Sequence, residues 1–366
     1  MISAGGERRT ASGVGSWVVS GRRRAARGVA IAVFVLAAFT LIWGSPPQIV
    51  SRSLRASAVS IRAALYAADV ASACGTIDLR LEEARNHSAA SEGVIGRKTG
   101  RGGGGGGGDG PTGYVCLTFD DWYLETWVED LVPLLEEYGA TATFFLPTSH
   151  VASASQADLG YLEVLSGYGH ELGHHSHSHG HGGDYVNGVS FRTRLTEYLI
   201  GEVQDGCSAF ESMGLPRPVS FAYPYGSSVD VLDKAMAPHF VFLRGTHSAA
   251  VVREGLTSDD NDVASAIRDL PVVGDMPELV PSAGLDEPVN EHVLMDVLDA
   301  LASAGHQGEG GGEKAVVFFA HSSHPDARLH VDLNRLDRML RYGTSLGLSF
   351  VSLSRLHSVR EGEGAG

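Results

Sequence analysis

Residues 114–121 read YVCLTFDD, and this stretch decides the fold. Its first six residues are mostly apolar and β-prone, so we expect a buried strand. Two carboxylates, Asp120 and Asp121, stand at the end of that strand. Like charges this close raise each other's pKa unless a cation shares them. A bound metal ion is the simplest such cation, so further metal ligands are expected downstream.

Downstream of residue 113, apolar strands alternate with amphipathic helices. We expect helices at 122–138, 159–165, 191–213, 291–304 and 331–342, and further strands at 141–146, 220–225, 240–243, 315–320 and 348–353. This alternation predicts a parallel β/α architecture. Several strands end in reactive groups, namely Asp120, Asp121, Tyr225, Arg244 and His321. Functional groups gather at the carboxyl ends of the strands in β/α barrels, so we favour a barrel over an open sheet.

Composition limits the classes of protein that this chain can belong to. Its 366 residues, 43% of them hydrophobic, suffice for one large domain with a full core. The net charge of −15 and the pI of about 5.5 argue against a nucleic-acid partner, which needs a basic face. Three cysteines do not make a disulfide scaffold. Cys116 reads as a small core residue, and a Cys74–Cys207 bridge would fit a secreted chain.

The N-terminal region looks like an export signal. Residues 1–44 combine an Arg-rich start with the uncharged run VAIAVFVLAAFTLIW at 29–43. A cleaved signal peptide fits this pattern, and so does a membrane anchor with the C-terminus outside. A mitochondrial presequence is a third interpretation, but the uninterrupted apolar run at 29–43 argues against it. We therefore expect the secretory pathway, with a secreted or single-pass membrane-anchored product whose catalytic domain lies outside.

A stalk and flexible linker are expected at 45–112, because an unbroken glycine run at 102–108 cannot hold a fixed backbone. The domain proper is expected at 113–357, and a flexible tail at 358–366.

Six histidines crowd residues 170–181. Two histidines four apart on a helical turn can share one zinc ion. Three pairs satisfy this spacing: His170/His174, His175/His179 and His177/His181. Spacing leaves the choice open, and a solvated histidine-rich loop is the alternative. Two histidines with one aspartate form a sensible catalytic zinc set that leaves positions for water and substrate.

Four segments in this order resemble the motifs of the polysaccharide deacetylases, the NodB-homology family or carbohydrate esterase family 4. They are TFDD at 118–121, GHELGHHSHSH at 169–179, FAYPYG at 221–226, and a buried strand that ends in His321. FVSLS at 350–354 is also similar to the family's last strand. The resemblance covers about residues 113–357 and implies a distorted (β/α) barrel of the NodB-homology type.

The resemblance also implies which residues form the metal site. It places a divalent metal, most simply Zn²⁺, on Asp121, His175 and His179. His174 stands where the family often has asparagine and is expected near the ligands or at the surface, not as a ligand. Ala222 stands where many members carry an arginine that orients the base, so Arg244 is a candidate for that task. The family's Asp-Trp motif is not found, although an acidic cluster lies at 259–262.

The implied chemistry is hydrolysis of an acetamide. Asp120 takes the position of the general base and His321 that of the general acid, while the backbone N–H of Tyr225 helps to hold the oxyanion. The expected substrate is a polymer of N-acetylated amino sugars, chitin-like or related. One alternative is a hydrolase of the same fold that acts on another non-peptide amide. Another is a non-catalytic glycan-binding or metal-binding module, against which the retained site residues argue.

Overall fold

A computed structural model of the protein describes residues 110–183, 195–246, 272–273, 276, 279–286, 289–305 and 313–360. All of them lie in the second of two units into which the chain divides, Ala63–Gly366. The signal or anchor segment at 29–43, the linker and the acidic cluster at 259–262 lie outside the described residues, and those assignments stay predictions. No helix in the described ranges is long and apolar enough to cross a membrane. Cys207 is disulfide-bonded, and Cys74, the partner suggested by the sequence, is not among the described residues.

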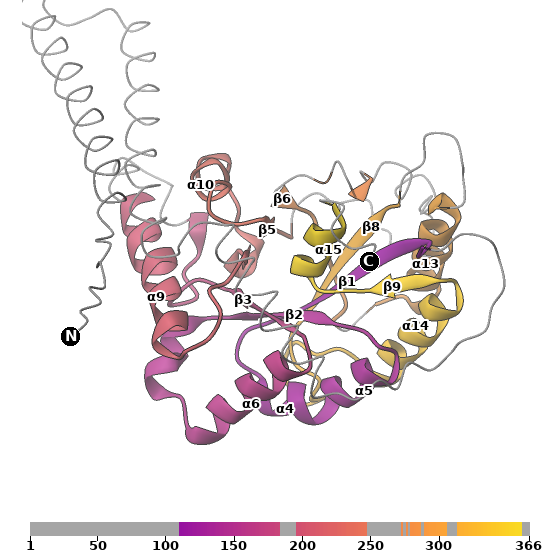
Figure 1. Ribbon diagram of the computed structural model, residues 1–366, viewed down its shortest axis with the longest axis horizontal. Helices are drawn as coiled ribbons and strands as arrows, with labels where there is room; N and C mark the ends of the chain where they lie inside the picture. Colours follow the sequence, from indigo (N-terminus) through magenta and orange to yellow (C-terminus); the bar gives the residue numbers. More distant parts are fainter. Residues whose placement is uncertain are drawn as a thin grey trace, which may run out of the picture. The chain divides into compact units, whose positions relative to one another are not determined.

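A single parallel sheet forms the centre of the domain (Figure 1). Its nine strands are β1 (Gly113–Asp120), β2 (Ala142–Leu146), β3 (Glu171–His174), β4 (Ser220–Ala222), β5 (Phe242–Arg244), β6 (Leu279–Val280), β7 (Ala283–Gly284), β8 (Ala315–Ala320) and β9 (Leu348–Phe350). They follow the order β6-β5-β4-β3-β2-β1-β8-β7, and β9 also pairs with β1. Every strand pairing is parallel.

The two ends of this sheet meet. β6 and β7 occupy opposite ends of the strand order, yet only Pro281 and Ser282 separate them in the chain. Because an extended chain spans at most about 3.6 Å per residue, the Cα atoms of Val280 and Ala283 lie within about 11 Å of each other. The Ser282 hydroxyl also donates to the Gly245 carbonyl, just beyond β5, at 2.7 Å. The sheet is therefore curled into a distorted barrel, which confirms the predicted fold class.

Helices surround the sheet, and π-helical turns interrupt two of them. They are α4 (Leu124–Thr126), the π-helical turn Trp127–Leu131, α5 (Val132–Glu137), α6 (Gln156–Gly167), the π-helical turn Tyr198–Gln204, α9 (Asp205–Ser212), α10 (Asp230–Met236), α13 (Glu291–Gly305), α14 (Leu333–Ser345) and α15 (Leu353–Arg360). Pro133 lies in the first of these helices, just after a shift in hydrogen-bonding register, in which the Val132 N–H bonds to the Trp127 carbonyl five residues back.

Alternation along β1 separates an outer core from the barrel interior. Val115, Leu117 and Phe119 pack with the surrounding helices in the larger apolar cluster. Tyr114 and Cys116 belong to a second cluster, which includes Phe145 of β2 and Phe242 of β5 and fills the interior. Because successive side chains of a strand point to opposite faces, Asp120 shares the interior face with Cys116 and Thr118.

Several elements differ from the sequence-based prediction. β3 was not expected, because its four residues ELGH carry no β-branched side chain and include a glycine. The strand predicted at 220–225 ends at Ala222, and a 3₁₀ turn, Pro224–Gly226, follows. The strand predicted at 348–353 ends at Phe350, and α15 begins at Leu353. α15 runs to Arg360, three residues into the predicted tail.

Truncation of a side chain on the central strand should measure how far the domain depends on its outer core. Leu117 is fully buried, so Leu117→Ala should lower the free energy of unfolding by about 2–5 kcal/mol. Leu329 is 41% exposed, so Leu329→Ala is the matched control and should change it by less than about 0.5 kcal/mol. Urea unfolding measures both. Equal losses in the two variants would contradict the assignment of Leu117 to the core.

Candidate active site

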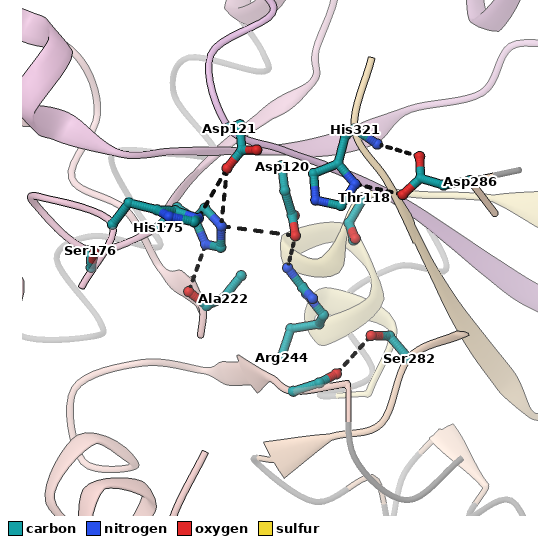
Figure 2. A network of polar contacts seen from close by, with 12 residues as sticks. Thr118, Asp120, Asp121, His175, Ser176, Ala222, Arg244, Ser282, Asp286 and His321 are labelled. Atoms are coloured by element: carbon teal, nitrogen blue, oxygen red, sulfur yellow. Dashed lines mark hydrogen bonds and ion pairs between the residues drawn. The ribbon is translucent and has the colours of Figure 1, made fainter. Parts of the chain in front are cut away.

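The carboxyl ends of three strands bring the predicted polar residues together (Figure 2). Asp120 ends β1, Arg244 ends β5, and His321 directly follows β8. Parallel strands place these ends on one rim of the barrel, which explains why residues far apart in the sequence meet there. Asp120 is only 3% exposed because it faces the barrel interior. The rim is thus lined by ionisable groups that are largely shielded from water.

Arg244 is the partner of the buried Asp120 carboxylate. Its Nη2 donates a hydrogen bond to Asp120 Oδ2, and the two side chains are almost completely buried. The guanidinium also lies over the rings of Phe145 and Phe319, 5.5 and 5.2 Å from their centroids. Asp120 Oδ1 has no hydrogen-bond partner among the described residues. One oxygen of this carboxylate is therefore fixed, and the other is free to accept a proton.

Asp121, His175 and His179 form the one group in the described part of the chain that could hold a metal ion. Asp121 Oδ1 lies 3.1 Å from His179 Nε2 and 3.7 Å from His175 Nε2. Ligands that bind zinc tetrahedrally at about 2.0–2.2 Å lie about 3.3 Å from each other. The two distances from Asp121 bracket that value, and all three ligand atoms lie within 4.8 Å of one another, so the group is compact enough for a small divalent ion.

The protonation states of His175 and Asp121 suit metal binding. His175 Nδ1 pairs with the Ala222 carbonyl at 2.9 Å, so Nδ1 carries the proton and Nε2 offers its lone pair to the ligand group. Burial lowers the pKa of His175 to about 4, which keeps the imidazole neutral as a metal ligand requires. Burial acts to raise the pKa of Asp121, but the hydrogen bond with His179 and the positive charges of nearby histidines outweigh it, so the pKa is lowered.

The backbone around the ligands is strained. Among the described residues, the non-glycine residues with positive φ are Asp121 (81°), Ser176 (61°), His179 (61°) and Tyr225 (59°). Two are candidate ligands, one lies between the histidines, and one is the predicted oxyanion residue. A left-handed conformation costs a non-glycine residue about 1–3 kcal/mol and is concentrated at functional sites. This clustering is independent of the motif assignment and points to the same place in the fold.

His321 is oriented by Asp286, a residue that the sequence analysis missed. Asp286 Oδ2 accepts from His321 Nδ1 at 2.6 Å, and Oδ1 accepts from the His321 backbone N–H at 3.1 Å. The Trp127 indole N–H donates to the His321 carbonyl at 2.7 Å. Burial alone would lower the pKa of His321, but the hydrogen bond with Asp286 and the charge of Asp120 outweigh it and raise the pKa.

The other predicted histidines lie away from the ligand group. His174 is fully buried, its Nε2 pairs with the Val203 carbonyl at 3.0 Å, and its ring packs among Phe210, Phe221 and Phe240. His174 was expected near the ligands or at the surface. It lies instead in the core, because it ends β3 on the face opposite to His175.

His170, His177 and His181 each pair with a protein group instead of joining a ligand set. The partners of their Nδ1 atoms are the Ala142 N–H, the Thr148 hydroxyl and the Ser227 hydroxyl, respectively. Of the three spacings left open by the sequence, the structure brings together the nitrogen atoms of His175 and His179. These two residues lie in a loop and not on the helical turn that the spacing argument assumed.

Tyr225 stands at the rim beside a candidate ligand. Its ring centroid lies 4.6 Å from that of His179 and 5.5 Å from that of His181, and the residue is 65% exposed. Within the described ranges, its backbone N–H makes no hydrogen bond outside the 3₁₀ turn. The next residue, Gly226, has φ 64°, and a Cβ there would lie 1.7 Å from Thr246 Oγ1. The turn that presents Tyr225 therefore requires glycine at 226.

Comparison with known proteins agrees with the resemblance. Residues 107–247 match the family model described as polysaccharide deacetylase. The match spans the motifs at 118–121, 169–179 and 221–226, and it confirms the resemblance to the polysaccharide deacetylases that the sequence predicts. Asp286 and His321 lie beyond the matched residues. No curated protein matches the chain.

Solved structures resemble the chain at low sequence identity. The Xyl-CE4 domain of a multidomain xylanase from the hindgut metagenome of Trinervitermes trinervoides is 16% identical, with a TM-score of 0.41 over 68% of this chain and 91% of that one. Peptidoglycan deacetylase PdaC from Bacillus subtilis is 20% identical, with 0.39 over 68% and 92%. BA3943, a CE4 family pseudoenzyme from Bacillus anthracis, is 16% identical, with 0.39 over 66% and 64%. These TM-scores lie below 0.5, so the resemblance to the polysaccharide deacetylases depends on the sequence match.

Replacement of Asp286 should change the titration of His321. Asp286→Asn removes the negative charge beside Nδ1 but leaves the burial, so the pKa of His321 should fall below its value in the parent protein. Titration of the His321 ring by NMR in metal-free protein measures the change. Asp326→Asn is the control, because the Asp326 side chain is 92% exposed and approaches His324 instead. An unchanged His321 pKa in Asp286→Asn would contradict the pairing.

Proposed function

We propose that this protein is a metal-dependent deacetylase that removes N-acetyl groups from a polymer of N-acetylated amino sugars, chitin-like or related. One observation carries the proposal. The ligand atoms of Asp121, His175 and His179 lie within 4.8 Å of one another, beside the buried carboxylate of Asp120. An aspartate that keeps one oxygen free next to a metal-ligand set is what hydrolysis of an amide by an activated water requires.

Asp121, His175 and His179 would hold the metal, and the remaining coordination positions would be open. When bound, a divalent ion, most simply Zn²⁺, supplies Lewis-acid chemistry: it lowers the pKa of a water molecule and polarises the acetyl carbonyl. The donor set of two nitrogens and one oxygen suits zinc and other divalent transition metals.

Asp120 acts as the general base. Its Oδ2 is held by Arg244, so Oδ1 is the atom that accepts the proton of the attacking water. Arg244 thereby takes over the orienting task of the arginine that many family members carry at the position of Ala222. The backbone N–H of Tyr225 donates to the oxygen of the acetyl group as negative charge develops there.

His321 acts as the general acid. Since Nδ1 is engaged by Asp286, Nε2 is the nitrogen that gives its proton to the leaving amine. The raised pKa keeps a larger fraction of the imidazole protonated near neutral pH than an ordinary histidine would have. A protonated acid and an ionised base can then coexist at the same pH, as general acid–base catalysis requires.

A polymeric, extracellular substrate is supported by the export signal and stalk predicted at 1–112. The partner is accordingly an N-acetylated glycan, with membrane attachment through residues 29–43 as one form of the mature protein. Another non-peptide amide substrate, or glycan binding without catalysis, would give a different result in the experiment that follows.

The test is acetate release from N-acetylglucosamine oligomers by the purified, zinc-loaded protein. Asp120→Asn should lower the rate by about 10²–10⁴-fold, because it removes the proton acceptor and keeps the side-chain shape. The matched control is Asp205→Asn, at an exposed position at the start of α9, which should retain the parent rate. Chelation of the metal should abolish release, and added zinc should restore it.

Three other outcomes separate the alternatives. Acetate release that is equal in the parent and in Asp120→Asn would exclude Asp120 as the base. Metal bound at one equivalent without any acetate release would favour another amide substrate or a binding module. A parent protein that binds no metal would contradict the site itself.

A further inference from the structure

The loop that carries both candidate histidine ligands has no regular secondary structure of its own. His175 follows the last residue of β3, and the chain to His179 is neither helix nor strand. Two of its residues, Ser176 and His179, have φ of 61°. A helical turn would fix the separation of two ligands through its own hydrogen bonds. In this loop, one internal hydrogen bond, from the Gly180 N–H to the Ser176 hydroxyl at 3.2 Å, acts together with contacts from outside to fix the separation of the two imidazoles.

One side of the loop is fixed by the chain beyond β2. The Thr148 N–H donates to the Ser176 carbonyl at 3.1 Å, and the Ser149 N–H donates to the His177 carbonyl at 2.7 Å. Both bonds use carbonyl groups of the loop. The N–H groups of the same stretch need acceptors elsewhere, because buried backbone donors are costly to leave unpaired.

Glu202 supplies those acceptors. Its Oε2 accepts hydrogen bonds from the backbone N–H groups of His177, at 3.1 Å, and Ser178, at 2.8 Å. Its Oε1 accepts from the Ser178 hydroxyl at 2.5 Å. All three bonds go to the residues between the two histidine ligands. Glu202 is only 5% exposed, and burial of a carboxyl group is costly unless such bonds compensate it.

The helix that carries Glu202 changes locally from α-helical to π-helical hydrogen bonding. Glu202 lies in the π-helical turn Tyr198–Gln204, and the Asp205 N–H bonds to the Ile200 carbonyl five residues back. π-helical turns are rare and are frequently found at functional sites. Residues 184–194, which precede this helix, lie outside the described part of the chain.

We propose that Glu202 is a positioning residue of the metal centre: it presets the separation of His175 and His179 and thereby sets the affinity for the metal. The inference rests on the proposed metal site. Glu202 touches neither the metal nor the substrate in this scheme and acts through His177 and Ser178. Residues that orient metal ligands in this way typically change metal affinity by about 10–100-fold when they are replaced.

Zinc titration calorimetry on the full chain tests the proposal. Glu202→Leu keeps a similar volume but offers no acceptor, so zinc should bind about 10–100-fold more weakly. Glu202→Gln should bind zinc more tightly than Glu202→Leu, since its carbonyl can accept from the two N–H groups and its amide can donate to the Ser178 hydroxyl. Glu211→Leu is the matched control: Glu211 lies exposed on α9, pairs with Arg217 at 3.2 Å, and its loss should leave zinc affinity unchanged.

A second readout separates positioning from general stability. Thermal melting of the metal-free variants reports folding, and the visible spectrum of cobalt-loaded protein reports ligand geometry. Folded Glu202→Leu with the parent's zinc affinity and cobalt spectrum would overturn the proposal, and so would an equal loss in Glu211→Leu. If Glu202→Leu does not fold, Glu202→Asp decides, because its carboxylate is one methylene too short. Parent affinity in Glu202→Asp would then refute the inference.

The failure of this inference can be distinguished from failure of the proposed function. A parent protein that binds no zinc removes the metal site and, with it, this inference. A parent that binds zinc and releases acetate, together with a Glu202→Leu variant that binds zinc equally well, refutes the role of Glu202 alone.

Discussion

The buried carboxylate of Asp120 is the constraint on which the site depends. Alternation along β1 turns this side chain into the barrel, where an uncompensated charge costs several kcal/mol. Arg244 compensates it from β5, on the far side of β2, β3 and β4 in the sheet. The pair can form because the sheet curls and brings these strand ends toward each other. Loss of one partner would leave the other charge buried, at a cost of about 3–5 kcal/mol.

Specific hydrogen bonds stabilise the strained backbone conformations in the loops around this pair. The Asp121 N–H bonds to the Phe145 carbonyl at 3.1 Å, and the Gly180 N–H bonds to the Ser176 hydroxyl at 3.2 Å. Together with Glu202, these contacts keep left-handed residues in place that would relax in a free loop. Supporting contacts of this kind hold the ligands close to one another, as a precise metal site requires.

Much of the site could be predicted because its reactive side chains stand at the ends of strands that the sequence pattern reveals. The central strand is recognisable by its apolar run at 114–119. Two adjacent carboxylates at its end, Asp120 and Asp121, indicate that a cation lies nearby. Arg244 could be named as a candidate because it ends a predicted strand. Asp286 could not, since β7 before it is two residues long and carries no strand signal. The orientation of His174 was also beyond the sequence, because it depends on β3, whose four residues lack a strand pattern.

The proposed chemistry depends on one metal ion held by two histidines and one aspartate, and X-ray absorption at the zinc edge of the loaded protein measures this ligand set. Two imidazole nitrogens should lie at about 2.0–2.1 Å from the zinc, with the remaining ligands oxygen. Replacement of His179 by alanine should reduce the imidazole contribution to one. A first shell that contains sulfur or more than two imidazoles, or a spectrum unchanged in His179→Ala, would show that other residues bind the metal.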